Sequence, residues 1–168
     1  FGWYQLTHPD MGTGGRIRGL ELEVQKRLTF LPGALSGLGV GANHTWLDAE
    51  GTYSNRPGVK LPFNGAAKRN WNVNVFCARG PVDLRVFVNY RSPYLTGIGA
   101  RPALDRYEDE RKTVNFVAKY AVNRRVTLNL DVNNITDSPK RSYQGDPSNP
   151  TSVRYYDWAV NFRVGLSL

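Results

Sequence analysis

Few residues in this chain have the types and spacing that catalysis or metal binding requires. The 168 residues contain two histidines, His8 and His44, and a single cysteine, Cys77. No second ligand stands at zinc spacing from His44, so a packed or rim histidine is the favoured interpretation. Nothing close in sequence to Cys77 would activate its thiol. The run GTGG at residues 12–15 lacks the lysine and the strand–helix context of a phosphate-binding loop. We therefore expect no enzyme activity, no metal and no cofactor.

Three consecutive acidic residues, Glu108, Asp109 and Glu110, form the remaining candidate for a cation site. Calcium takes roughly six to eight oxygen ligands arranged around the ion. Three neighbouring carboxylates do not by themselves provide that arrangement, and the sequence favours a solvated end of a loop.

Arginine and tyrosine recur in or beside the turn-rich stretches of the chain. Arginine offers a fork of donors that matches carboxylate or phosphate, and tyrosine offers an amphipathic contact surface. These residue types predict contact with an anionic group. The candidates are Arg56, Arg91, Tyr94, Arg101, Arg106, Tyr107, Arg141, Tyr143 and Arg154.

The net charge restricts the classes of partner. The chain has 22 Lys and Arg against 14 Asp and Glu, a formal charge of +8, which favours nucleic acid, anionic lipid or an anionic ligand. The basic residues are spread along the chain and form no basic helix or patch, so we expect no nucleic-acid partner. No apolar run approaches the roughly 18 residues of a membrane-spanning helix.

The elements that must position these residues are clearest at the end of the chain. In residues 153–168, every second side chain is apolar and the intervening ones are largely polar. Successive side chains of a strand point to opposite faces. A soluble strand usually spans about five or six residues, whereas a strand that crosses a bilayer needs about 9–11. A long strand with an apolar face, Tyr156 and Trp158 at one end, is therefore predicted here.

The same alternation recurs along the chain, and it predicts seven strands. Lys26 and His44 are exceptions on the apolar faces, and for Lys26 either a position near a rim or a β-bulge would explain the charge. The predicted strands cover residues 16–30, 38–48, 67–78, 82–91, 113–120, 126–133 and 153–168.

The connections between the predicted strands alternate in length. Residues 31–37, 80–81 and 121–124 form short turns, whereas 49–65, 92–107 and 137–152 form long loops, and residues 1–15 form a further loop. Outer-membrane barrels have short periplasmic turns and long outer loops. The alternation places residue 168 at the periplasmic end.

Large aromatic side chains near the ends of the apolar faces favour a membrane over a soluble β-sandwich. In a sandwich core their polar atoms would need buried partners, whereas at a membrane interface they reach water. We predict as membrane-interface aromatics Trp46, Trp71, Tyr90, Tyr120, Tyr156 and Trp158.

An odd number of strands has a further consequence. Single-chain bacterial barrels have even numbers, and an open sheet edge is not tolerated in lipid. The predicted fold is all-β, a transmembrane antiparallel β-barrel, of which residues 1–168 are an incomplete piece, the C-terminal part.

Several stretches, in this order, resemble the C-terminal portion of TonB-dependent outer-membrane receptors. They are GLELE at residues 19–23, LPG at 31–33 with GLG at 37–39 and ANHT at 42–45, VNYRS at 88–92, LNLDVNNITD at 128–137, and YDW at 156–158 with GLSL at 165–168. The resemblance implies a barrel of 22 strands around an N-terminal plug. It also implies that the plug, the earlier strands and the TonB-box are absent from this chain. The family usually ends on an aromatic residue, and this sequence ends on Leu168.

The resemblance implies a receptor of the bacterial outer membrane that imports a bulky, scarce nutrient of the siderophore, cobalamin or saccharide type. Its partners would be outer-membrane lipid and lipopolysaccharide, an unknown extracellular ligand, and the TonB complex reached through the missing N-terminal region. The loop arginines and tyrosines either touch an anionic ligand at the extracellular mouth, or contact lipopolysaccharide phosphates or water. A passive porin-like barrel and a β-rich adhesion or carbohydrate-binding module remain as alternatives.

Overall fold

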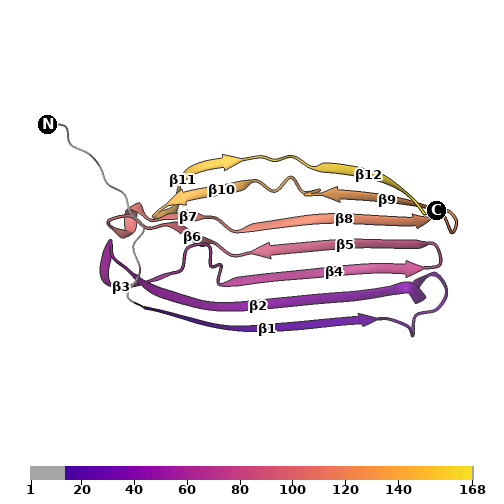
Figure 1. Ribbon diagram of the computed structural model, residues 1–168, viewed down its shortest axis with the longest axis horizontal. Coiled ribbons are helices and arrows are strands. Elements are labelled where there is room, and N and C mark those ends of the chain that lie inside the picture. The colour runs from indigo at the N-terminus through magenta and orange to yellow at the C-terminus, as the bar shows by residue number, and fades with distance from the viewer. Residues whose placement is uncertain (1–13, 168) are drawn as a thin grey trace.

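The computed structural model describes residues 14–167, which are almost entirely antiparallel β-structure (Figure 1). Residues 1–13, with His8 and most of the predicted N-terminal loop, and Leu168 lie outside the described residues. The elements are β1 (Gly15–Arg27), η1 (Gly33–Gly37), β2 (Leu38–Tyr53), β3 (Arg56–Pro62), β4 (Arg69–Arg79), β5 (Val82–Arg91), β6 (Tyr94–Gly97), η2 (Pro102–Leu104), β7 (Arg106–Glu108), β8 (Arg111–Ala121), β9 (Val126–Asn133), β10 (Lys140–Gln144), β11 (Asp146–Arg154) and β12 (Ala159–Leu166).

The main sheet contains seven strands at the predicted places, although the last of them begins later than predicted. They lie side by side in the order β1-β2-β4-β5-β8-β9-β12, each antiparallel to its neighbours, and β3 adds to one end of β2. The short turns lie at one end of this sheet and the long connections at the other (Figure 1). The shortest turn is Gly80-Pro81, where Gly80 adopts a φ of 55° that glycine tolerates without strain. The predicted alternation of connections is confirmed.

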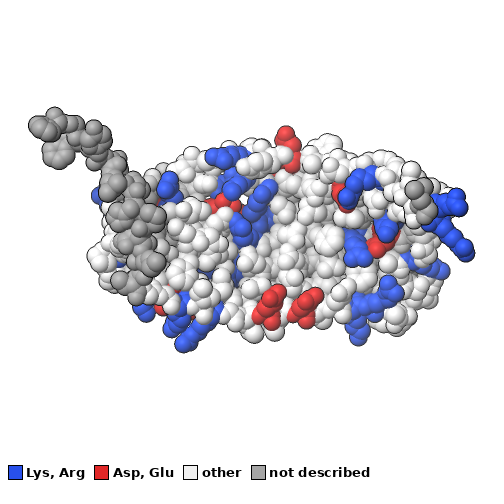
Figure 2. All heavy atoms as spheres, in the orientation of Figure 1, with Lys and Arg blue, Asp and Glu red and all other residues white. Residues whose placement is uncertain are grey.

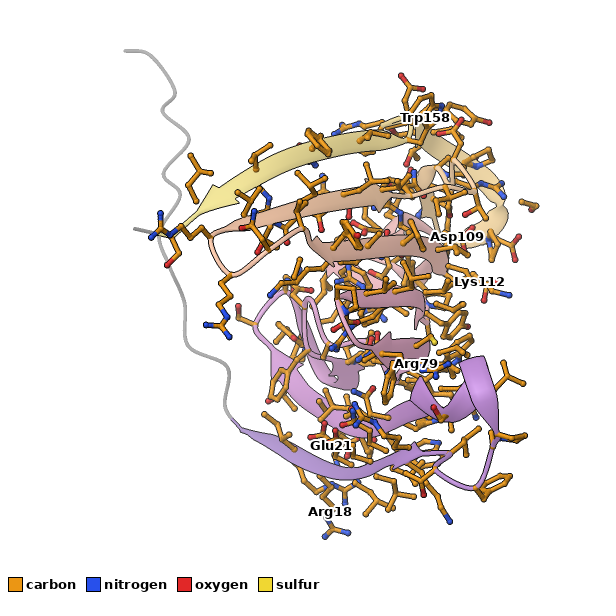
Figure 3. All side chains as sticks on the ribbon, turned by 90° about the vertical axis from the view of Figure 1, so that its right-hand side faces the viewer. Arg18, Glu21, Arg79, Asp109, Lys112 and Trp158 are labelled. Carbon is orange, nitrogen blue, oxygen red and sulfur yellow. The ribbon has the colours of Figure 1, made fainter. Side chains whose placement is uncertain are left out.

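The register sorts the side chains of the main sheet onto two faces. One cross-strand row on what we call the outer face is apolar over six strands: Val40, Val75, Val86, Phe116, Val132 and Val160. The opposite, inner face carries polar rows such as Asn43, Asn72, Asn89 and Thr113. Figure 3 shows the sheet curving, with Arg18, Lys112 and Trp158 on the outside of the curve and Glu21 on the inside.

The outer face has no second layer packed on it. Val86 is 41% exposed, and both Phe162 and Trp158 are 62% exposed. In a sandwich these side chains would be buried between two sheets. The sandwich alternative is therefore wrong for the part of the chain that the structure describes.

Where the sequence predicts long loops, the structure has additional strands, and the loop assignment is wrong there. β6, β7, β10 and β11 form a second sheet in the order β11-β10-β7-β6. We call this sheet, together with β3 and η2, the cap. Leu95 is fully buried in it, and Asp105 and Tyr143 are 2% and 8% exposed. The cap therefore has a small core of its own at the long-connection end of the molecule.

The predicted strand over residues 153–168 is also wrong as a single element. β11 ends at Arg154, residues 155–158 are not in a strand, and β12 begins at Ala159. Asp157 adopts a positive φ of 55°, and its carbonyl accepts a hydrogen bond of 3.3 Å from the side chain of buried Asn134. The chain therefore turns before β12. The strand with the alternating apolar side chains begins at Ala159 and does not include Tyr156.

The charge on the apolar side of β1 has a simple explanation. Lys26 is the next-to-last residue of β1 and pairs with Val40. The pairing of β1 with β2 runs from Gly15 to Arg27 without a register shift. The lysine therefore lies near the end of its strand, as the rim interpretation predicts, and no bulge is involved.

No helix among residues 14–167 is long and apolar enough to cross a membrane.

Candidate anion-binding site

Two cross-strand rows on the inner face form the floor of a polar site at the long-connection end. Asn70 pairs with Arg91, and Arg91 pairs with Arg111. The next row contains Asn72, Asn89 and Thr113. All six side chains share the inner face because β4, β5 and β8 pair in register, and residues two apart along a strand point to the same side.

The cap supplies the other side of the site. Glu108, at the end of β7, forms two ion pairs. Its carboxylate lies 3.2 Å from Nη2 of Arg91, which donates a hydrogen bond to it, and 2.7 Å from Nζ of Lys140 in β10. The guanidinium carbon of Arg91 lies 4.0 Å from the centre of the Tyr94 ring, within the range of a cation–π interaction. One carboxylate thus stands among three cations, Arg91, Arg111 and Lys140.

The charge of the site is not balanced internally. Arg91 and Arg111 lie directly opposite each other, an arrangement that is unfavourable for like charges. Arg111 has no carboxylate partner among residues 14–167: Nη2 donates to the carbonyl of Ser138 at 3.3 Å, and buried Nε has no hydrogen-bond partner. The site therefore has the donors and the positive charge to accept an additional anionic group.

The protonation of Glu108 is set by its neighbours. Partial burial acts to raise the pKa of the carboxyl group, but hydrogen bonds from Lys140 and Tyr94 and the charges of Lys140 and Arg91 outweigh it. The pKa of Glu108 is consequently below its usual value, and the carboxylate is ionised at neutral pH.

The cluster surrounds a hollow of about 460 Å³ lined by these cations, Glu108, Tyr90 and the polar residues of the two rows. Figure 2 looks onto the inner side of the sheet, where basic side chains gather around acidic ones towards the long-connection end and again near the short turns. The hollow is large enough for a carboxylate, phosphate or similar group of a ligand.

The structure brings together only some of the nine predicted ligand-contacting residues. Arg91 and Tyr94 lie at the site. Arg56 is 9% exposed and its Nη1 contacts both carboxylate oxygens of buried Asp105, at 2.8 and 2.6 Å, so it joins β3 to the cap. Tyr107 and Tyr143 stack at 5.1 Å inside the cap.

The remaining four predicted residues lie elsewhere on the cap. Arg141 contacts Asp109 at 3.9 Å, and Arg106 packs beside Gly97. Arg101 precedes η2 and Arg154 ends β11, and both are exposed. These positions are separate from the hollow on the inner face.

Sequence reasoning did not assign Glu108, Arg111 and Lys140 to a site. Arg111 lies two residues before Thr113 and therefore on the same face of the strand. The predicted strand begins at residue 113, whereas β8 begins at Arg111, so the alternation would indicate Arg111 if the strand were extended by two residues. The three consecutive acids diverge: Glu108 contacts Lys140, Asp109 faces Arg141, and Glu110 accepts a hydrogen bond of 2.7 Å from Tyr90. No cluster of three or more metal-ligating side chains occurs within residues 14–167.

The six predicted interface aromatics lie at the ends of the outer face or beside them. Tyr120 is near the short-turn end of β8, and the other five are towards the long connections. Trp71 and Tyr90 stack at 5.2 Å, and Trp46 stacks on His44 at 3.6 Å. Tyr156 lies 5.9 Å from the guanidinium of Arg111. Their contact with a membrane interface remains a prediction.

Comparison with known proteins identifies the type of fold. The chain is similar to the crystal structure of the siderophore receptor PiuA from Acinetobacter baumannii, with a TM-score of 0.62 and 19% sequence identity. The similarity covers 90% of this chain and 22% of the receptor. The fold is of the receptor-barrel type. The predicted all-β, antiparallel fold is thereby confirmed, and the similar protein is a receptor and not an enzyme. No family model and no curated protein sequence matches the chain.

Proposed function

We propose that residues 1–168 are the C-terminal part of the barrel domain of a bacterial outer-membrane receptor. The receptor imports a bulky, scarce nutrient of the siderophore, cobalamin or saccharide type. Import is driven by the TonB complex, which binds a region outside this chain. The fold similarity to a siderophore receptor supports this assignment, and so does the position of a cationic hollow at the long-connection end of the inner face.

The observation that carries the proposal is the exposed apolar outer face. Leu22, Val75, Phe162 and Leu166 are 55%, 45%, 62% and 74% exposed. Burial of apolar surface lowers the free energy by about 25 cal/mol for each Å² removed from water. An apolar face of this extent therefore requires a hydrocarbon environment or a partner. Its inner counterpart is polar, which is the alternation of a barrel strand that has lipid on one side and a lumen on the other.

The two edges of the main sheet support a larger barrel. β1 and β12 are its terminal strands, and among the described residues, 14–167, each pairs on one side only. Unpaired backbone groups cost several kcal/mol each in hydrocarbon, so both edges require further strands. In the proposed receptor these are the earlier strands of the same barrel.

The role we assign to the hollow is contact with an anionic group of the ligand. Arg91, Arg111 and Lys140 provide positive charge and donors, and Glu108 forms ion pairs with Arg91 and Lys140. The floor of Asn70, Asn72 and Asn89 offers further amide donors and acceptors. A ligand that carries carboxylate, phosphate or deprotonated phenol oxygens fits this chemistry.

The proposal is tested with the full-length protein in a Gram-negative host that lacks its own nutrient receptors. Ferric siderophores, cobalamin and oligosaccharides are supplied in separate cultures, with and without a functional TonB complex. Saturable uptake of one class that disappears without TonB supports the proposal. Uptake that persists without TonB identifies a passive porin, and a protein released from membranes by alkaline carbonate, without detergent, is not an outer-membrane barrel.

The hollow is tested with Arg91→Gln/Arg111→Gln and a matched control, Arg124→Gln/Arg125→Gln, in the exposed turn after β8. Charge-assisted hydrogen bonds to a ligand are individually strong, so we expect half-saturation of uptake to rise about tenfold or more in the first variant. The control should leave half-saturation unchanged. An equal effect of both variants would show that the general positive charge matters and the hollow does not.

A further inference from the structure

A second group of cations lies on the outer face of the main sheet and is therefore separate from the site on the inner face. Arg18, Lys68 and Arg69 are exposed at the long-connection end of β1 and β4, and none has an ion-pair partner within residues 14–167. The nearby carboxylates are already occupied. Asp48 is 3.1 Å from Arg16, and Glu50 is 3.3 Å from Arg16 and 3.4 Å from Lys60.

These three cations line one hollow together. Its volume is about 400 Å³, and Leu20, Trp46 and Asp48 also contribute to its wall. Asp48 lies opposite Arg18, and its carboxylate contacts Arg16, so the three cations still outnumber the single acidic group. Leu20 pairs with Trp46, and Trp46 pairs with Arg69, so the tryptophan ring lies between the two charged strands. Arg18 and Glu21 lie on opposite sides of β1, and Arg18 is on the outside of the curved sheet (Figure 3).

An apolar hollow of about 650 Å³ adjoins the charged one on the outer face. Leu22 and His44 line it and are the next outward positions along β1 and β2 after Leu20 and Trp46. Val24, Ala42 and Val73 follow towards the middle of the sheet. The order from the rim inwards is therefore cations, then stacked rings, then aliphatic side chains.

We propose that this groove binds a phosphate-bearing lipid, with the phosphate between Arg18, Lys68 and Arg69 and an acyl chain along β1, β2 and β4. Arginine forks match phosphate, and the apolar hollow matches hydrocarbon. An acidic peptide would leave its backbone groups unpaired in the apolar hollow, and an uncharged lipid would leave the cations unused. The inference rests on the proposed membrane setting of the outer face.

The experiment uses the full-length protein purified in detergent and diphosphoryl lipid A as the probe. Lipid A from which both phosphates have been removed serves as the comparison. Native mass spectrometry measures the apparent dissociation constant for wild type, for Arg18→Gln/Lys68→Gln/Arg69→Gln, and for a control. The control, Arg79→Gln/Arg124→Gln/Arg125→Gln, removes three exposed cations at the short-turn end (Arg79 is labelled in Figure 3).

Loss of three charge-assisted contacts should weaken binding of diphosphoryl lipid A about tenfold or more, while the control binds as wild type does. The wild-type protein should bind the lipid A that lacks both phosphates more weakly than diphosphoryl lipid A, by a similar factor. Equal binding by the triple variant and wild type, or an equal loss in the control, would overturn the inference. Heat-modifiable migration, retained in the triple variant, shows that the barrel is folded, so a failed lipid site is distinguishable from a failed receptor assignment.

Discussion

The cap and the main sheet place their apolar side chains in opposite ways. In the cap, Leu95 is fully buried and Tyr107 stacks on Tyr143, as in a small water-soluble domain. In the main sheet, Val86 and Phe162 are exposed on an apolar face and the polar residues line the inside of the curve. The cap therefore has its own core, whereas the apolar outer face of the main sheet is uncovered within residues 14–167, which supports the hydrocarbon surroundings that we propose for it.

The two cation groups differ in a related way. On the inner face, Arg91 and Lys140 share Glu108, and the surrounding side chains are amides and hydroxyls. On the outer face, Arg18 and Arg69 form no ion pair with a carboxylate of residues 14–167 and adjoin rings and aliphatic groups. The inner group therefore suits a water-soluble anion, and the outer group suits an anion attached to a hydrocarbon chain.

The largest expected effect comes from breaking the core of the cap. Asp105→Ala removes the carboxylate that accepts from Arg56 and from the backbone N–H of Gly99 at 2.9 Å. Breaking a buried pair leaves an uncompensated charge and costs about 3–5 kcal/mol. We expect faster amide hydrogen exchange in β7 and β10 and unchanged exchange in β5, measured by mass spectrometry on the purified protein.

The matched control for that prediction is Arg56→Met/Asp105→Leu, which replaces both charges by apolar groups and should recover most of the protection. Loss of protection in β5 as well would show that the cap and the main sheet are one cooperative unit. The contrast between the two regions would then be wrong.

A smaller effect is expected from a charge on the apolar face. Phe162→Arg places a cation on the outer face of β12, where a charge at the bilayer midplane costs about 2–4 kcal/mol. Asn161→Arg, the control one residue earlier, points to the inner face opposite Asp131 and should change stability little. Urea unfolding of the protein in lipid vesicles measures both. Equal stability of the two variants would contradict the assignment of the faces.

The smallest effect concerns the competition between Glu108 and a bound anion. Because the pKa of Glu108 is lowered, its ionised contacts persist above the ordinary value of 4.5 and are lost as the pH falls below it. Sulfate keeps its double charge in this range and is the probe. Wild-type affinity should be constant from neutral pH to about 5 and rise a few-fold in more acidic buffer. Calorimetry on the full-length protein measures it.

In Glu108→Gln the competing charge is absent at every pH. The variant should bind sulfate a few-fold more tightly than wild type at neutral pH, with a flat pH profile. A profile for Glu108→Gln that still rises on acidification would assign the pH dependence to another group.

The seven strands of the main sheet follow from the sequence because each alternates at period two, although β12 is shorter than the predicted strand over residues 153–168. The cap strands do not, since β3 contains Pro57 and Pro62 and β11 contains Pro147 and Pro150, which normally indicate loops. Their pairing depends on partners far away in the chain, such as β7 with β10. Short-range patterns carry no information about such pairing.

The candidate site shows the same limit. Arg91 and Tyr94 are predicted as ligand-contacting residues from their residue types and from their place at the end of a predicted strand. Their association with Glu108 and Lys140 requires the register of β5 with β8 and the folding of the cap over the inner face. The break before β12 likewise depends on buried Asn134, a long-range contact that no local pattern indicates.

Whether the apolar face of the main sheet faces lipid and the polar face faces water is tested most directly by a scan of cysteine replacements along β5 in a Cys77→Ser background of the full-length protein. Val86→Cys, Phe87→Cys, Val88→Cys and Asn89→Cys are spin-labelled in lipid vesicles, and collision with oxygen and with a water-soluble nickel complex is measured. We expect alternation, with oxygen collisions dominant at positions 86 and 88 and nickel collisions relatively greater at 87 and 89. Equal accessibility at all four positions, or the reverse alternation, would contradict it.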